Sequence, residues 1–189
     1  QFFNHQSLQF VKTAKGYGLV YWLTEVKTDN KKITAKDGVR RFIANYVPKT
    51  DDGKLLEFDE LIKRGLKRDG NLGLPRLAIL KADVDNVELI LNHGLPNLSL
   101  SQLTAMSRTL DLFFGGVLPE LVKTEFPDTY IIYAGGDDLL VMGYWKDIIA
   151  LSVRINQLFR QWCGNHPSLT LSAGIALIKQ KYPIHRGAE

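Results

Sequence analysis

The sequence predicts an α+β fold of the ferredoxin-like kind: an antiparallel sheet with both helices on one of its faces. Three observations lead to this prediction. From residue 77 onward, apolar runs of strand length alternate with amphipathic stretches of helix length. Their order is β-α-β-β-α-β, as in split β-α-β domains. A Gly-Gly pair joins two of the apolar runs, which is typical of a β-hairpin.

Each element follows from a local pattern. Ser99 and Gln102 have the spacing of a helix N-terminal capping box, and apolar residues then recur at spacings of three and four. Gly115, Gly116 and Pro119 are expected to kink or shorten the end of that helix. The expected elements are a strand over 77–83, a helix over 99–121, a hairpin over 130–142, a helix over 146–163 and a strand over 169–178.

The first 74 residues lack this regularity and are expected to form a linker or accessory segment. Strands are predicted over 18–26 and 40–47 and a short helix over 58–67. Breaker residues over 70–75 place the boundary before a second domain at 75–189. Residues 1–75 hold 14 basic and 9 acidic side chains, against 10 and 11 over 76–189. This basic excess suits either an RNA or acidic partner, or a merely solvated surface.

The composition excludes several classes of protein. Apolar residues make up 45% and charged residues 23% of the 189, which is globular rather than disordered or fibrous. No apolar run is long enough to cross a bilayer, so no membrane partner is expected. A single cysteine, Cys163, excludes an internal disulfide and a multi-cysteine zinc site. We therefore expect a soluble cytoplasmic protein, and the helix-like start at the last residues suggests a piece of a longer chain.

Four carboxylates are the strongest candidates for chemistry. In a ferredoxin-like sheet, the first strand and the strand leaving the hairpin are central neighbours. Asp83 and Asp85 at the end of that first strand should therefore approach Asp137 and Asp138 at the turn. Carboxylate oxygens suit Mg²⁺ or Mn²⁺, and such a site can drive nucleotidyl transfer from a nucleoside triphosphate. An acidic turn without chemistry is the competing interpretation.

Two glycines shape the turn. Gly135 and Gly136 permit positive φ, and they let phosphate oxygens reach backbone N–H groups without meeting a β-carbon. The two glycines therefore leave the backbone of the turn accessible to phosphate.

Four sequence blocks carry a family resemblance. They are Leu80–Asn86 (LKADVDN), Tyr133–Leu139 (YAGGDDL), Leu171–Ala176 (LSAGIA) and Lys181–Ile184 (KYPI). In this order and spacing they resemble the second palm domain of the Cas-ten family, the large subunit of type III-A (Csm) CRISPR effector complexes. The resemblance covers about residues 75–189, and more loosely the linker before them, where some relatives bind zinc through cysteines that this stretch lacks.

The resemblance implies an enzyme that makes cyclic oligoadenylates from ATP when its complex binds a foreign transcript. It implies that Asp83, Asp137 and Asp138 hold the metal ions with support from Asp85. Ser172 and Lys181 are implied as nucleotide contacts, although a strand hydroxyl bonding to backbone and a solvated lysine are the plainer interpretations. The implied partners are the other type III-A subunits, guide RNA and target RNA.

Two departures leave alternatives open. No adjacent His-Asp pair occurs in the chain, so the family's nuclease activity is not predicted for it. The family builds its site from two palms, so this segment alone should bind nucleotide weakly. A palm that only binds partner subunits and guide RNA is therefore a second hypothesis. A diguanylate cyclase is a third, although those enzymes have Glu where this chain has Asp138.

Overall fold

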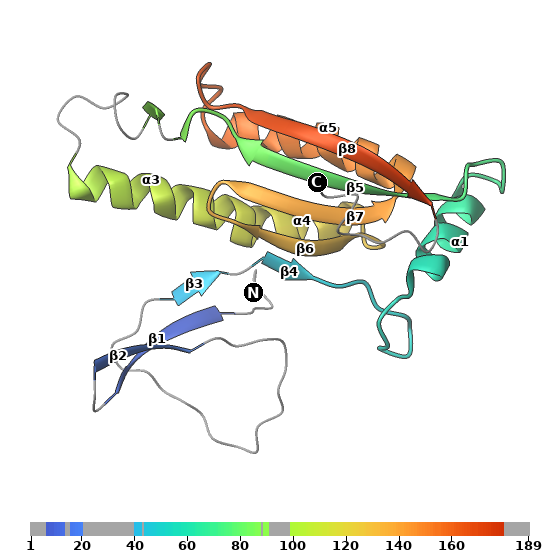
Figure 1. Cartoon of the computed structure of the whole chain (residues 1–189), viewed down its shortest axis with the longest axis horizontal. Coiled ribbons are helices and arrows are strands. Elements are labelled where there is room, and N and C mark those ends of the chain that lie inside the picture. Colours follow the sequence, from blue (N-terminus) through green and yellow to red (C-terminus); the bar gives the residue numbers. More distant parts are fainter. Residues whose placement is uncertain are drawn as a thin grey trace.

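A five-stranded antiparallel sheet forms the centre of the molecule (Figure 1). The computed structural model describes residues 7–13, 16–20, 40–42, 44–87, 89–90 and 99–179. The strand order is β4-β6-β7-β5-β8, so the first palm strand, β5, and the strand leaving the hairpin, β7, are central neighbours as predicted. The strands are β4 Ala44–Tyr46, β5 Arg76–Val84, β6 Tyr130–Gly135, β7 Asp138–Tyr144 and β8 Leu171–Lys179.

The helices confirm the predicted element order. Ser99 accepts a hydrogen bond from the backbone N–H of Gln102, whose side chain caps Ser99 in return, so the predicted capping box is present. Where the sequence predicts a kinked or shortened helix end, the structure has a π-helical turn that contains Gly115 and Gly116. The helix continues beyond this turn as α4, so the first palm helix has three segments. The helices are α1 Phe58–Arg68, α3 Leu100–Leu112, the π-helix η1 Phe113–Val117, α4 Leu118–Glu125 and α5 Trp145–Trp162.

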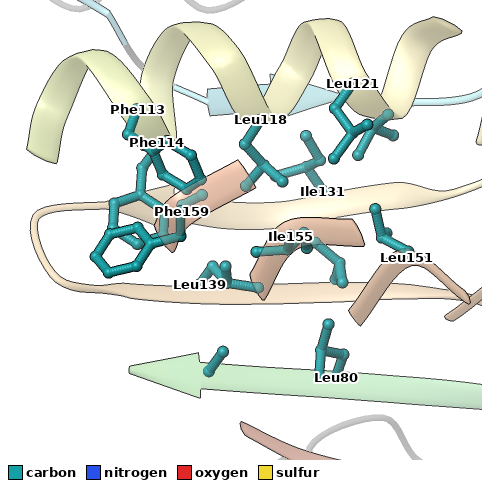
Figure 2. Close-up of a cluster of buried hydrophobic side chains, with 14 of the residues drawn as sticks. Leu80, Phe113, Phe114, Leu118, Leu121, Ile131, Leu139, Leu151, Ile155 and Phe159 are labelled. Carbon is teal, nitrogen blue, oxygen red and sulfur yellow. The ribbon is translucent and has the colours of Figure 1, made fainter. Parts of the chain in front are cut away.

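Both palm helices cover one face of the sheet. Alternate residues of a strand point to opposite faces, and Ala78 and Leu80 of β5 belong to the core beneath α3, η1, α4 and α5. Figure 2 shows this cluster, in which the rings of Phe113 and Phe159 meet edge to face with centroids 5.1 Å apart. This core is the ferredoxin-like arrangement that the sequence predicts.

A second, smaller core forms on the other face of the sheet. Leu77 and Ile79 of β5 pack there against Leu61 and Ile62 of α1. Figure 1 shows α1 at the end of the sheet remote from the β6–β7 turn. The helix therefore covers one end of this face and leaves the end near the turn open.

The first 74 residues supply a strand and a helix to the palm, a contribution that their sequence does not predict. The predicted strand over 40–47 is two strands: β3 Arg40–Phe42 pairs with β1 Ser7–Thr13, whereas β4 pairs with β6 of the palm sheet. The predicted strand over 18–26 is described only where β2 Gly16–Val20 overlaps it; its remainder lies outside the described residues. The boundary after residue 74 remains a prediction, although β4 and α1 both belong to the palm's packing.

Charged side chains fasten α1 to the palm. Asp128, which is 8% exposed, pairs with Arg64 at 3.2 Å and with Arg68. The Tyr144 hydroxyl donates to Asp69 at 2.7 Å, and Lys146 pairs with the same carboxylate. These contacts hold α1 against the end of the sheet that is remote from the β6–β7 turn.

None of the helices in the described ranges is both long enough and apolar enough to span a membrane.

Candidate functional site

The end of β5 lies beside the turn of the β6–β7 hairpin. Asp83 and Asp138 are direct partners in the β5–β7 register, and the Val84 N–H donates to the Asp137 carbonyl at 2.8 Å. Residues paired across an antiparallel ladder point to the same face. The predicted approach of Asp83 to the hairpin carboxylates is therefore present in the structure.

The turn has the backbone that its glycines permit. Gly136 has a φ of +67°, and positive φ at only the first central residue is typical of a type II′ turn. Gly135 ends β6 opposite Asp138. A β-carbon built on either glycine would meet nothing within 4 Å, so the space around the turn is open to a ligand.

Three polar side chains form a row across the open face. Asp138 of β7 is the register partner of Asp83 of β5, which in turn is the partner of Ser172 of β8. Lys81 lies two residues before Asp83, on the same face and opposite Gly174, where an added β-carbon would also meet nothing within 4 Å. The row thus combines two carboxylates and a hydroxyl, with a lysine beside them.

The electrostatics of the row favour a cation. Burial and the charges of Asp137, Asp138 and Asp85 raise the pKa of Asp83, and Lys81 only partly opposes this. Like charges that converge in this way are relieved by a divalent ion. Within the described ranges, however, no three acidic, histidine or cysteine side chains already stand around a common point for an ion. The donor chemistry therefore suits Mg²⁺ or Mn²⁺, with side-chain rearrangement as the ion binds.

Tyr133 is a site residue that the sequence analysis missed. Its hydroxyl donates to the Asp138 carboxylate at 2.8 Å. Burial, this hydrogen bond and the charges of Asp138 and Asp83 raise the pKa of Tyr133 to about 12. The phenol therefore remains a donor at neutral pH and holds one oxygen of Asp138 in place.

Asp85 differs from the other three aspartates. Its two oxygens accept hydrogen bonds from Ser172 at 2.5 Å and from Thr170 at 2.6 Å. These two bonds lower the pKa of Asp85. The carboxylate faces β8 hydroxyls, so its predicted role as a supporting metal ligand remains a prediction, and Thr170 is a second residue that the sequence analysis did not single out.

A pocket of about 190 Å³ adjoins the turn on the helix-covered side. Gly136 and Asp137 line it together with apolar side chains and Ser107 of α3. A flat, largely apolar group with a polar edge fits such a lining. Lys181, the remaining predicted nucleotide contact, lies outside the described residues.

Asp83→Asn is expected to raise the melting temperature of the metal-free chain at pH 7 by about 1–2 °C. The raised pKa means that the ionised carboxylate is less favourable in the folded chain than in the unfolded one, so its removal relieves the cost of burying the charge and the repulsion from the other aspartates. That penalty is absent once Asp83 is protonated, so the gain should vanish near pH ~3. Thermal scans of the variant and of Asp52→Asn, an exposed control, would check this; an equal gain at both pH values would contradict it.

The comparisons with known proteins concern the fold and the family of the chain. The model of the Cas10/Cmr2 second palm domain matches residues 76–189. The curated single-strand-specific deoxyribonuclease Cas10/Csm1 (subtype III-A) of Methanocaldococcus jannaschii is 37% identical over 141 residues, which are 68% of this chain and 17% of that protein. The Streptococcus thermophilus protein of the same description is 34% identical over 167 residues, 84% of this chain and 20% of that protein. The chain therefore spans about a fifth of the length of the curated relatives it matches.

Solved structures resemble the chain over nearly its whole length. A Csm1–Csm4 cassette in complex with cA3 and one in complex with AMPPNP each give a TM-score of 0.73 at 26% identity, covering 97% of this chain and 30% of theirs. Csm1 of T. onnurineus gives a TM-score of 0.71 at 25% identity, over 98% of this chain and 30% of that one.

Proposed function

Because the chain belongs to the Cas10/Cmr2 family and carries its second palm domain, we propose that it binds ATP and divalent cations for nucleotidyl transfer in a type III-A CRISPR effector complex. The product would be cyclic oligoadenylates, as the resemblance to the Cas-ten family implies. Similar Csm1–Csm4 structures that contain AMPPNP, one ATP or cA3 support the choice of adenine nucleotides.

One observation carries this proposal: Asp83 is the register partner of Asp138 and its neighbour Val84 hydrogen-bonds to Asp137. The carboxylates of Asp83 and Asp138, which are more than fifty residues apart in the chain, thus lie side by side on the open face. Burial first, and then the charges of the neighbouring aspartates, raise the pKa of Asp83, so protein groups do not fully compensate its negative charge. A cation-dependent site explains this arrangement better than an inert acidic turn does.

The residues have distinct tasks in the proposed reaction. Asp83, Asp137 and Asp138 would hold the divalent cations, with Tyr133 orienting Asp138. Gly135 and Gly136 would allow the triphosphate to approach the backbone, and Lys81 would offer it a positive charge. When bound, the divalent ions would lower the pKa of a ribose 3′-hydroxyl and neutralise charge on the departing pyrophosphate.

The bonds balance without a further reactant. The 3′-oxygen of one nucleotide forms a bond to the α-phosphorus of another, and the bond from that phosphorus to the β-phosphate oxygen breaks. Pyrophosphate leaves, and the hydroxyl proton passes to solvent. The chain's contribution is to hold the two reacting groups in line and to stabilise the growing negative charge.

The proposed partners follow from the same family. Csm1–Csm4 structures resemble this chain, so we place it against other type III-A subunits, guide RNA and target RNA. Deoxyribonuclease activity belongs to the names of the longer relatives; the sequence here has no adjacent His-Asp pair, and we do not assign that activity to it.

A palm that serves only as a scaffold is the second candidate function. It is favoured by the absence, among the described side chains, of a ready-made group of three ion ligands. Titrating ATP into the full-length protein with Mn²⁺ and again with EDTA separates the two functions. We expect ATP binding at least about tenfold tighter with Mn²⁺, because the ion bridges carboxylates and phosphate.

Equal ATP affinity with and without the ion would favour the scaffold. A competition with GTP in the same assay tests the third hypothesis: a diguanylate cyclase would take GTP in preference to ATP, whereas the proposed enzyme would not.

A further inference from the structure

Asp85 and two hydroxyls join the end of β5 to the start of β8. The Asp85 N–H donates to the Thr170 carbonyl at 2.8 Å. Its carboxylate then accepts from the Thr170 hydroxyl at 2.6 Å and from the Ser172 hydroxyl at 2.5 Å. Three hydrogen bonds thus fix one aspartate beside the proposed site.

The direction of these bonds is determined by chemistry. An ionised carboxylate has no proton to donate, so both hydroxyls must be the donors. A serine hydroxyl has a single proton, and that of Ser172 is committed to Asp85. The exposed side chain of Ser172 therefore offers a ligand only oxygen lone pairs.

A phosphate group cannot form a hydrogen bond with the Ser172 hydroxyl oxygen. The oxygens of an ionised triphosphate are themselves acceptors, and two acceptors without a proton between them form no hydrogen bond. The groups on ATP that can donate are the ribose hydroxyls and the adenine amine. Since Ser172 lies directly beside Asp83 in the register, it is placed next to where the reacting ribose and phosphate must meet.

We propose that Ser172 accepts a hydrogen bond from a ribose hydroxyl of bound ATP, and that Asp85 is a positioning residue that fixes the Ser172 proton, not a metal ligand. This inference rests on the proposed function, and it specifies that β8 contacts the ribose of the nucleotide. The adenine amine is less well placed, because the apolar pocket for a flat group lies across the sheet, next to Gly136 and α3.

The test compares ATP with 2′-deoxy-ATP and 3′-deoxy-ATP, binding to the full-length protein in the presence of Mn²⁺. The wild type should bind one of the two deoxy analogues about tenfold more weakly than ATP, the worth of one hydrogen bond. Ser172→Ala should lose about the same factor for ATP and should no longer distinguish that analogue from ATP. Ser172→Ala that keeps the full discrimination would overturn the proposal.

Asp85→Asn tests the second half of the proposal. An amide has one acceptor oxygen and a donor nitrogen, so at most one of the two hydroxyls keeps its original bond. Mn²⁺ affinity measured without nucleotide should stay within about twofold of wild type, while discrimination between ATP and the deoxy analogue falls. Loss of Mn²⁺ binding comparable to that of Asp83→Asn would overturn the positioning role.

Thr170→Ser is the matched control, because it keeps the hydroxyl that donates to Asp85 and should retain both Mn²⁺ affinity and discrimination. Thermal melting of every variant checks that each is folded. If the wild type binds ATP with Mn²⁺ but binds both deoxy analogues as tightly as ATP, this inference fails and the proposed function stands. If the wild type shows no ion-dependent ATP binding, the proposed function itself fails.

Discussion

Replacing Asp138 with alanine in the full-length effector complex is expected to lower the rate of product formation from ATP by about a thousandfold or more. Asp138 sits beside Asp83 and receives the Tyr133 hydrogen bond, so its loss removes a cation ligand whose position the protein has fixed. The combined change of Asp137 and Asp138 to alanine should abolish the product. Chromatography of the nucleotide products after incubation with ATP and Mn²⁺ measures both effects.

Assembly of the complex should be unaffected, because Asp138 lies at the hairpin turn and is not one of the buried residues that form the two cores. Asp52→Ala in the exposed turn before α1 is the control and should retain full activity. Tyr133→Phe keeps the carboxylate but removes the donor, so its loss of rate should be smaller, about tenfold. Continued synthesis by the double variant would refute the assignment of the site.

Gly65→Leu is expected to destabilise the chain by about 3 kcal/mol, the upper part of the range for overpacking. Gly65 of α1 lies directly against the Tyr144 ring, and even a single β-carbon there would overlap the ring. Tyr144 is 1% exposed and its hydroxyl is fixed by Asp69, so it has no space to move into. Such a loss corresponds to a fall of about 6–12 °C in melting temperature.

Lys67→Leu provides the matched control, since it places the same side chain on the exposed side of the same helix. It should change the melting temperature by no more than about 2 °C. Equal melting temperatures for the two variants would show that α1 does not pack on the palm as described. The experiment therefore also tests whether the predicted boundary after residue 74 separates α1 from the palm.

The sequence was most informative where local signals were strong. The Gly-Gly turn, the capping box at Ser99 and the spacing of apolar residues in the two palm helices predicted the observed elements to within a few residues. The ferredoxin-like order then placed Asp83 beside the hairpin without any knowledge of side-chain contacts. That step worked because strand adjacency follows from topology rather than from single residues.

Tyr133 could not be found in this way because of a backbone irregularity. Strict alternation along β6 would put Tyr133 on the same face as Ile131, beneath the palm helices. The register shifts between these two residues, and the extra residue of this β-bulge turns Tyr133 to the open face instead. No sequence pattern around it marks the bulge, so the hydrogen bond to Asp138 was invisible beforehand.

The contacts of Asp85 and the place of β4 were hidden for a different reason. Thr170 and Ser172 meet Asp85 across more than eighty residues of chain, and their pairing depends on the exact β5–β8 register. β4 is only three residues long and becomes a strand because β6 offers it an edge. Local propensity carries no information about such long-range partners.

The π-helical turn at Phe113–Val117 has an effect beyond the helix that contains it. Each residue turns a regular helix by about 100°, and a π-turn takes in one residue more than a regular turn does. Shortening this segment by one residue would therefore swing the whole of α3 around its axis relative to α4. Leu103 and Met106, which line the pocket beside Gly136, would then point in another direction. The shape of that pocket therefore depends on the π-helical turn, although the turn lies further along the helix.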